Sequence, residues 1–230
     1  MPEPTSLTYI WHVHKGCLWY RVRVKGKQAH ATLPHLGVNA FEEMVQLLMK
    51  FIECRKVVEQ RVSIFKAYPV EGNRASIAIG GMCGCCEAVN VVPGEAWFTN
   101  DRRVLPEENI KEVEEEIKTI VNEFRRSNLD VIVELENLLR IEPSYIDPDH
   151  ELVRLIRRSI KEALSVDAEP VLCPGFLNIR YFIGKGMPAV AWGPGSLEQA
   201  HALNEYIELD KFFKWMKALV TFLLHALGGH

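Results

Sequence analysis

The feature that most constrains the fold of this chain is a hydrophobic period that switches between two and 3.6 along residues 16–139. Leu7 to Lys27 is predicted to be extended, because Trp19, Arg21 and Arg23 alternate with Tyr20, Val22 and Val24. Asn39 to Val57 then spaces its apolar residues as on one face of a helix. A second helix is predicted from about Pro106. Four further strands are predicted at Arg61–Tyr68, Ala75–Met82, Glu95–Val104 and Asp130–Leu138.

This order, strand–helix–strands–helix–strand, predicts a ferredoxin-like α+β sandwich with its helices on one face of an antiparallel sheet. The C-terminal part has another pattern, with helices predicted at Pro148–Leu164 and Leu209–Leu227. Pro188 to Trp192 is a short apolar run, typical of a strand buried on both faces of a parallel or mixed sheet. We therefore expect residues 16–140 to be inserted in an incomplete α/β domain built from residues 1–15 and 141–230.

The charge and hydropathy of the chain exclude some classes of partner. The net charge is −3 and no basic stripe is present, so we do not expect a nucleic acid partner. The longest apolar run, Ala218 to Leu227, is shorter than the roughly 20 residues that span a bilayer. Because no signal pattern begins the sequence either, we expect a cytoplasmic protein without a membrane partner.

The chain contains six cysteines, and three of them crowd into Cys83-Gly84-Cys85-Cys86. A structural metal site needs a second cluster at a suitable spacing, and the sequence has none. Reduced thiols in a loop are therefore the preferred interpretation.

Four polar residues stand where chemistry is plausible. His201 follows the apolar run and its glycines, as ligand-binding residues do at the carboxyl ends of buried strands. His30 lies between a predicted strand and a helix, and Asn90 precedes a Pro-Gly turn. Glu3 lies between two prolines, in the segment Pro2-Glu3-Pro4-Thr5. Taken singly, these residues are equally explained as loop histidines, a turn asparagine and a solvated carboxylate.

Taken in order, the segments around these residues resemble one family. It comprises acetylornithine deacetylase, succinyl-diaminopimelate desuccinylase, aminoacylase and glutamate carboxypeptidase, which are co-catalytic zinc amidohydrolases. The resemblance implies an α/β catalytic domain with an inserted α+β lid that forms the dimer interface. The segments that carry it are Pro2-Glu3-Pro4-Thr5, Gly26-Lys27-Gln28-Ala29-His30, Asn90-Val91-Val92-Pro93 and Ala200-His201-Ala202-Leu203-Asn204-Glu205.

The resemblance also implies roles for single residues. Glu3 matches the ligand of one zinc ion, and His201 matches the ligand of the other. His30 matches the lid histidine that reaches across the homodimer and helps to hold the reacting carbonyl oxygen. Asn90 matches a substrate contact of the lid.

A turn from Gly175 to Arg180 matches another substrate-binding segment of the family, and Arg180 could pair with a substrate carboxylate. Asn178 stands in this turn where the family has Asp. This departure bears on the identity of the substrate more than on the type of reaction.

The implied activity is hydrolysis of small N-acyl amino acids or related amides with zinc, cobalt or manganese. The first His-x-Asp segment, the bridging Asp and the Glu-Glu pair of the family have no match here, and His12-Val13-His14 does not fit them. We therefore expect the chain alone to be inactive and to need an N-terminal portion, which could be a separately encoded chain. The alternative is a non-catalytic dimerisation or interaction remnant. In either case, apolar surface should be exposed where sheet partners are missing.

Overall fold

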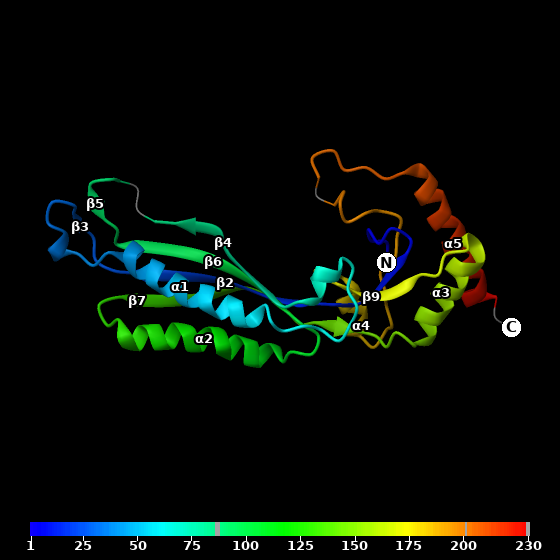
Figure 1. Cartoon of the computed structure of the whole chain (residues 1–230), viewed down its shortest axis with the longest axis horizontal. Coiled ribbons are helices and arrows are strands. Elements are labelled where there is room, and N and C mark those ends of the chain that lie inside the picture. The colour runs from blue at the N-terminus through cyan, green and yellow to red at the C-terminus, as the bar shows by residue number, and fades with distance from the viewer. Residues whose placement is uncertain (86–87, 201, 229–230) are drawn as a thin grey trace. The chain divides into compact units, whose positions relative to one another are not determined.

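The computed structural model of the chain describes residues 1–85, 88–200 and 202–228, which form two compact units (Figure 1). The first unit contains residues 1–15, 64–73 and 143–230. The second unit contains residues 16–63 and 74–142. Within the described residues, no helix is both long enough and apolar enough to cross a membrane.

The second unit has the predicted ferredoxin-like order of elements. Its antiparallel sheet has the strand order β4-β6-β2-β7. Helices α1 and α2 pack on one face of this sheet and enclose its core (Figure 1). The elements are β2 (Gly16–Lys25), α1 (Ala40–Val58), β4 (Ser76–Gly84), β6 (Glu95–Val104), α2 (Ile110–Ser127) and β7 (Ile132–Ile141).

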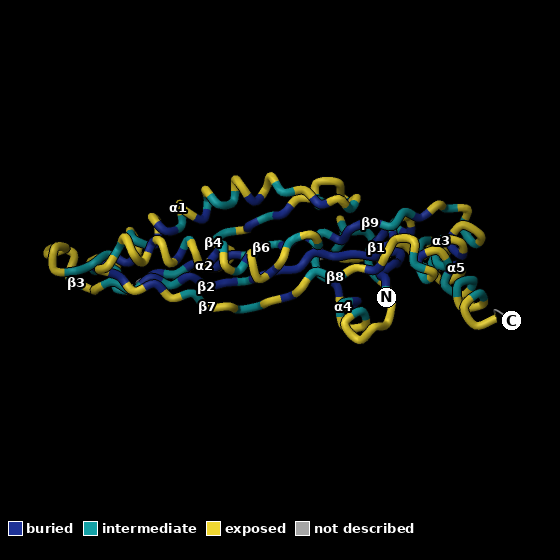
Figure 2. Tube along the Cα trace, turned by 90° about the horizontal axis from the view of Figure 1, so that it is seen from below, coloured by how far each residue is buried: buried dark blue, intermediate teal, exposed yellow. Residues whose placement is uncertain are grey.

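The alternation of β2 explains this layering. Leu18, Tyr20, Val22 and Val24 are buried under the helices, while the residues between them are partly exposed on the other face (Figure 2). That second face carries cross-strand ion pairs, among them Arg21–Glu136 at 3.1 Å. A period of two therefore separates an apolar face from a charged face, as it does in any half-buried strand.

A small two-stranded ribbon extends the second unit. It is formed by β3 (Ala29–His30) and β5 (Val91–Val92), which pair antiparallel. The 3-10 helix Pro34–Leu36 follows β3 and leads toward α1.

The first unit is built on a three-stranded sheet of order β8-β1-β9. β1 (Tyr9–His14) pairs parallel with β9 (Glu169–Cys173) and antiparallel with β8 (Ser144–Tyr145). Its helices are α3 (Glu151–Leu164), α4 (Ile179–Ile183) and α5 (Leu209–Leu227), and the 3-10 helix Val70–Asn73 also belongs to it. α3 and α5 pack against each other.

Two of the predicted strands are wrong. Arg61–Tyr68 contributes two isolated bridges, an antiparallel one from Val62 to Arg74 and a parallel one from Ala67 to Leu172. Its second half joins the first unit, where the Leu172 N–H donates to the Lys66 carbonyl (2.7 Å). Pro188–Trp192 is extended and buried at its end, but it makes only one antiparallel bridge, from Ala191 to Trp11. In both segments the backbone N–H and C=O groups make isolated hydrogen bonds to residues far away in the sequence, and they do not form a continuous β-ladder.

Candidate functional site

A cavity of about 410 Å³ in the first unit is lined both by Glu3 and by residues on either side of position 201 in the sequence. Glu3 lines it between two prolines. The loop that follows Gly193 forms the rest of its wall, with Pro194, Gly195, Ser196, Gln199, Glu205, Tyr206 and Ile207.

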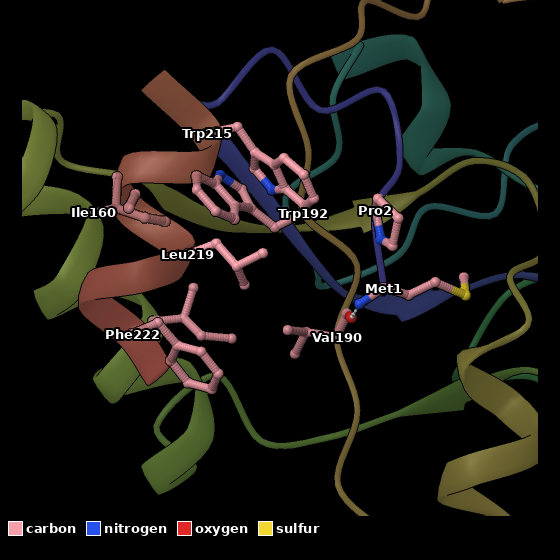
Figure 3. Close-up of a pocket in the computed structure, with 10 residues that line it drawn as sticks. Met1, Pro2, Ile160, Val190, Trp192, Trp215, Leu219 and Phe222 are labelled. Atoms are coloured by element: carbon pink, nitrogen blue, oxygen red, sulfur yellow. Dashed lines mark hydrogen bonds between the residues drawn. The ribbon is translucent and has the colours of Figure 1, made fainter. Parts of the chain in front are cut away.

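Hydrogen bonds hold the segment around Glu3 on this loop. The Met1 amino group donates to the Val190 carbonyl (2.8 Å; Figure 3), and the Ser6 N–H donates to the Gly195 carbonyl (2.8 Å). The buried Thr5 hydroxyl donates to the Gly193 carbonyl (3.2 Å) and accepts from the Gly193 N–H (3.0 Å). Glu3 is therefore positioned by the backbone on both sides of it.

The local backbone is closely packed and partly strained. A Cβ at Gly193 would lie 2.4 Å from the Glu3 carbonyl oxygen, so only glycine allows this approach. Ser6 (φ 55°) and Leu7 (φ 64°) both occupy the left-handed region, which is costly for residues other than glycine. Such strain often accompanies functional sites, and here it turns the chain from the cavity into β1.

The Glu3 carboxyl group is partly withdrawn from water. Burial raises its pKa above the ordinary value, and the nearby Met1 ammonium opposes this by lowering it. A bound cation would favour the charged carboxylate in the same way as the ammonium does.

His201, the second predicted metal ligand, lies outside the described residues. Gln199 and Glu205, which flank it in the sequence, both line the cavity with Glu3. The motif around His201 includes Glu205, but the resemblance implied no role for that residue. Its place in the same loop as His201 was the signal that could have identified it as a second carboxylate of this cavity.

Gly175 and Arg180 lie near the C-terminal end of β1. Gly175 follows Cys173, which pairs with His14 at the end of β1, and neither Gly175 nor Arg180 lines the cavity. The Arg180 guanidinium donates to the Leu177 carbonyl (2.9 Å) and to Asn178 Oδ1 (3.2 Å).

Arg180 also packs against aromatic rings, with its guanidinium carbon 4.3 Å from the centre of the Tyr181 ring. The turn residue Asn178 therefore helps to orient Arg180. A guanidinium has five N–H donors in a fixed fork, and the carboxylate-binding role of Arg180 remains a prediction.

The two histidines of β1 are structural. His12 Nδ1 donates to the Ile146 carbonyl (2.7 Å), and His14 Nδ1 donates to the Lys15 carbonyl (2.7 Å). His14 Nε2 accepts a hydrogen bond from the Ser144 hydroxyl (2.9 Å). The pKa of His14 is lowered to about 4, mainly by burial. The hydrogen bond to Lys15 opposes this shift, and the positive charge of Arg180 adds to it. Its ring is therefore neutral at pH 7.

In the second unit, His30 and Asn90 lie side by side. The β3–β5 ribbon pairs His30 with Val91, and the Ala31 N–H donates to the Asn90 carbonyl (2.9 Å). Both residues are exposed. His30 Nδ1 accepts from the Thr32 N–H (3.3 Å), so the proton of the neutral ring belongs on Nε2. The ribbon thus presents an imidazole N–H donor beside a side-chain amide.

The donor atoms in the cavity suit a divalent ion only in part. Carboxylates such as those of Glu3 and Glu205 are accepted by zinc, cobalt and manganese. The described part of the chain, however, contains no group of three His, Cys, Asp or Glu side chains that could hold a metal ion. Cys83 and Cys85 are exposed and form no disulfide. The described residues alone therefore do not make a complete metal site.

Comparisons of the sequence with known proteins point to one family. Residues 12–127, about half of the chain, match the peptidase dimerisation domain of the M20 family. The acetylornithine deacetylase of Pectobacterium carotovorum is 30% identical over 99% of this chain and 56% of its own length. An uncharacterised metallohydrolase of Methanocaldococcus jannaschii is 27% identical over 91% of this chain and 52% of its own. The chain thus spans about half the length of the curated relatives it matches.

Solved structures show the same fold. A tripeptidase from Staphylococcus aureus superposes on 96% of this chain with a TM-score of 0.72, using 54% of its own length, at 16% identity. Human carnosine dipeptidase 1 superposes on 95% of this chain with a TM-score of 0.69, using 56% of its own length, at 17% identity.

Proposed function

Because this chain belongs to the M20 peptidase family, we propose that it is part of a metal-dependent amidohydrolase that cleaves small N-acyl amino acids or related amides. The observation that carries the proposal is the shared cavity of Glu3 and the loop on both sides of position 201. The two predicted ligands are 198 positions apart (201 minus 3) in the sequence. An unrelated fold would have no reason to bring their segments together.

In this proposal Glu3 and His201 each supply one ligand to one of two metal ions, which are zinc, cobalt or manganese. One ligand per ion does not hold a metal tightly, because such ions take about four ligands. We propose that the remaining ligands and the general base come from a portion of the M20 fold outside these 230 residues. The lack of a three-ligand group among the described residues supports this requirement.

A bound divalent ion would supply an activated water and polarise the amide carbonyl. The residues of this chain would add binding and orientation. His30 can donate its Nε2–H to the oxygen that becomes negative during attack, and Asn90 beside it can bind the substrate through its amide. We propose that both act in the active site of the partner protomer. Arg180, in the turn that begins at Gly175, would pair with the carboxylate of the amino acid.

The homodimer should form through the α1 side of the second unit. Phe41, Val45 and Met49 are exposed on one face of α1, and Leu48 and Ile52 continue this face. α1 packs beside β4, a strand at the edge of the sheet. The exposed face of α2, by contrast, carries charged residues such as Glu115 and Lys118. An apolar helix face next to an open sheet edge suits a two-fold interface better than a charged face does.

One observation favours a second candidate function, a non-catalytic dimerisation or interaction protein. Asn178 replaces the carboxylate that the family places beside Arg180, and here its amide oxygen accepts a hydrogen bond from that arginine. A chain that had lost catalysis would still form the dimer. It would not hydrolyse amides even when it is mixed with the remaining portion of the M20 fold.

Reconstitution tests the proposal. The chain is mixed with the part of the Pectobacterium carotovorum acetylornithine deacetylase that has no counterpart in it, and release of the amine from N-acetyl-L-ornithine is measured with added zinc. We expect no hydrolysis by either piece alone and zinc-dependent hydrolysis by the mixture. Glu3→Gln should reduce the rate by at least about 100-fold, because it removes a charged metal ligand.

Glu198→Gln is the matched control, because Glu198 is exposed in the same loop and does not line the cavity. It should leave the rate unchanged. Hydrolysis by the chain alone would contradict the need for a second portion. A complex that forms but hydrolyses nothing would support the non-catalytic alternative.

A further inference from the structure

α5 exposes a continuous apolar stripe to solvent. Phe213, Met216, Val220, Leu223 and Leu227 are 64, 43, 52, 44 and 82% exposed, and much of α5 is yellow in Figure 2. Their spacings alternate between three and four residues, which places them on one side of a helix.

The opposite side of the same helix is already packed. Ala218 is fully buried, and Trp215, Leu219 and Phe222 line an apolar pocket of about 210 Å³ (Figure 3). α3 closes this pocket with Ile160, and the buried Trp192 contributes another wall. At 100° per residue, Val220 and Leu227 lie about 160–200° around the helix axis from Ala218.

α5 is therefore apolar on both sides, although among the described residues only one of these sides is packed. A helix that is apolar all round is normally buried on all sides. Several contiguous large apolar side chains exposed together mark an interaction surface. Alternating spacings of three and four are also those of residues that interlock with a second helix.

A second copy of the chain is a poor candidate for this stripe. The dimerisation domain, residues 12–127, does not include α5. If α5 also paired with α5 of another copy, each chain would have two separate two-fold interfaces. Two such interfaces generate open-ended assemblies unless their two-fold axes combine into a closed symmetry.

The solved relatives point to a different partner. They are matched over 95–96% of this chain but over only 54–56% of their own length, so nearly half of each lies outside the match. Met1 and Pro2 also line the α5 pocket, on the side formed by Trp192 and Val190 (Figure 3).

We infer that the α5 stripe is the docking surface for one amphipathic helix from the remaining portion of the M20 fold. This inference rests on the proposed function, since it concerns the portion that would complete the site. On the polar side of α5, Lys211 is already paired with Glu208 and Lys214 with Asp210, each at 2.6 Å. Recognition of the incoming helix should therefore depend on the apolar stripe and not on charge.

A binding measurement without substrate tests this inference. The probe is the part of the Pectobacterium deacetylase outside the match, checked first for binding to the matched part of its own enzyme. Its Kd for the wild-type chain and for Val220→Glu is measured by isothermal titration calorimetry. We expect at least about tenfold weaker binding for Val220→Glu, since a carboxylate would be buried among apolar side chains.

Two further variants control for folding and for charge. Val220→Ile keeps the stripe apolar and should bind as the wild type does. Leu129→Glu places the same charge at a residue that is 87% exposed outside α5, and it should also bind normally. Helix content by circular dichroism should be the same in all variants, because the altered side chains are exposed.

Several results would overturn the inference. They are undiminished binding by Val220→Glu, no binding of the probe to the wild type, self-association of the chain that Val220→Glu abolishes, and binding of α5 to lipid vesicles in place of the probe. The outcome is independent of catalysis. A complex that binds through α5 but hydrolyses nothing refutes the proposed function and leaves the docking inference standing. An active mixture whose binding is unchanged by Val220→Glu refutes the docking inference and leaves the proposed function standing.

Discussion

The imidazole of His14 is fully buried, and this burial is the main reason why the ring is neutral. Its Nδ1–H donates to the Lys15 carbonyl, and its Nε2 accepts from the Ser144 hydroxyl. Its pKa is about 4 in the folded chain, against 6.5 for an ordinary histidine. The unfolded chain therefore binds a proton first as the pH falls. The stabilisation is complete above pH 6.5 and is lost as the pH falls toward 4, by up to about 3 kcal/mol.

His14→Gln should flatten this pH dependence, whatever its effect on stability at pH 7. The measurement is the free energy of urea unfolding at several pH values between 6.5 and 4. His35→Gln is the control, because His35 is exposed and should leave the slope as in the wild type. An unchanged slope in His14→Gln would show that His14 does not carry this dependence.

Arg102 carries a buried charge in the second unit, where it is 1% exposed and paired with Glu108. Glu108 also accepts from Arg61 (2.8 Å) and from the Leu105 N–H (2.7 Å). Burial raises the pKa of Glu108, but Arg102 and these hydrogen bonds outweigh burial and lower it overall. Glu108→Gln leaves the Arg102 charge unpaired and should destabilise the chain by about 3 kcal/mol at pH 7.

The loss in Glu108→Gln should shrink in acid, because the stabilisation by Glu108 is present above the ordinary pKa of 4.5 and disappears as the pH falls through the lowered value. The free energy of urea unfolding at pH 7 and pH 3, compared between the wild type and Glu108→Gln, measures this change. Glu115→Gln removes an exposed i,i+3 pair with Lys118 and should cost less than about 1 kcal/mol. Equal effects of the two variants would contradict the role of burial.

At the scale of the element, α1 depends on its first turn. Asn39 caps the helix, since its side-chain oxygen accepts from the N–H groups of Phe41 (3.1 Å) and Glu42 (3.3 Å). Asn39→Ala should destabilise the chain by about 1 kcal/mol, and Asn39→Asp should restore most of the loss because aspartate caps equally well. Chemical unfolding midpoints decide this, and an Asn39→Asp variant as weak as Asn39→Ala would argue against capping.

At the scale of the whole molecule, the proposed dimer depends on the exposed apolar face of α1. Val45→Glu combined with Met49→Glu should convert the dimer into a monomer, because buried carboxylates without partners are costly. Sedimentation equilibrium gives the molar mass directly. Thr119→Glu on α2 is the control and should remain dimeric. A dimer that survives both α1 substitutions would place the interface elsewhere.

Much of the second unit could be predicted from local patterns alone. β6 was predicted with its observed bounds, and α1 to within one residue at each end, because their side chains alternate between core and solvent at the period of the element. The start of α2 was missed by four residues, since Asn109 and not Pro106 precedes its first turn. The ferredoxin-like order then follows from the sequence of elements.

The candidate site could be predicted only as a set of residues. The motifs named Glu3, His30 and Asn90, and the structure places His30 beside Asn90 and puts Glu3 in one cavity with Glu205. No local pattern could show that Gly175 and Arg180 lie near the C-terminal end of β1 and do not line this cavity. Their placement depends on the parallel pairing of β1 with β9, which lies about 160 residues further along the chain.

The sequence by itself determined the type of each long element and the membership of the family, because periodicity and motifs are local properties of the chain. Only the tertiary structure decided that residues 64–73 leave the predicted strand and join the first unit, that the run before Gly193 makes a single bridge, and that α5 is bare on one side. The physical reason is the same in each case. Backbone pairing and burial at these places depend on partners far away in the sequence.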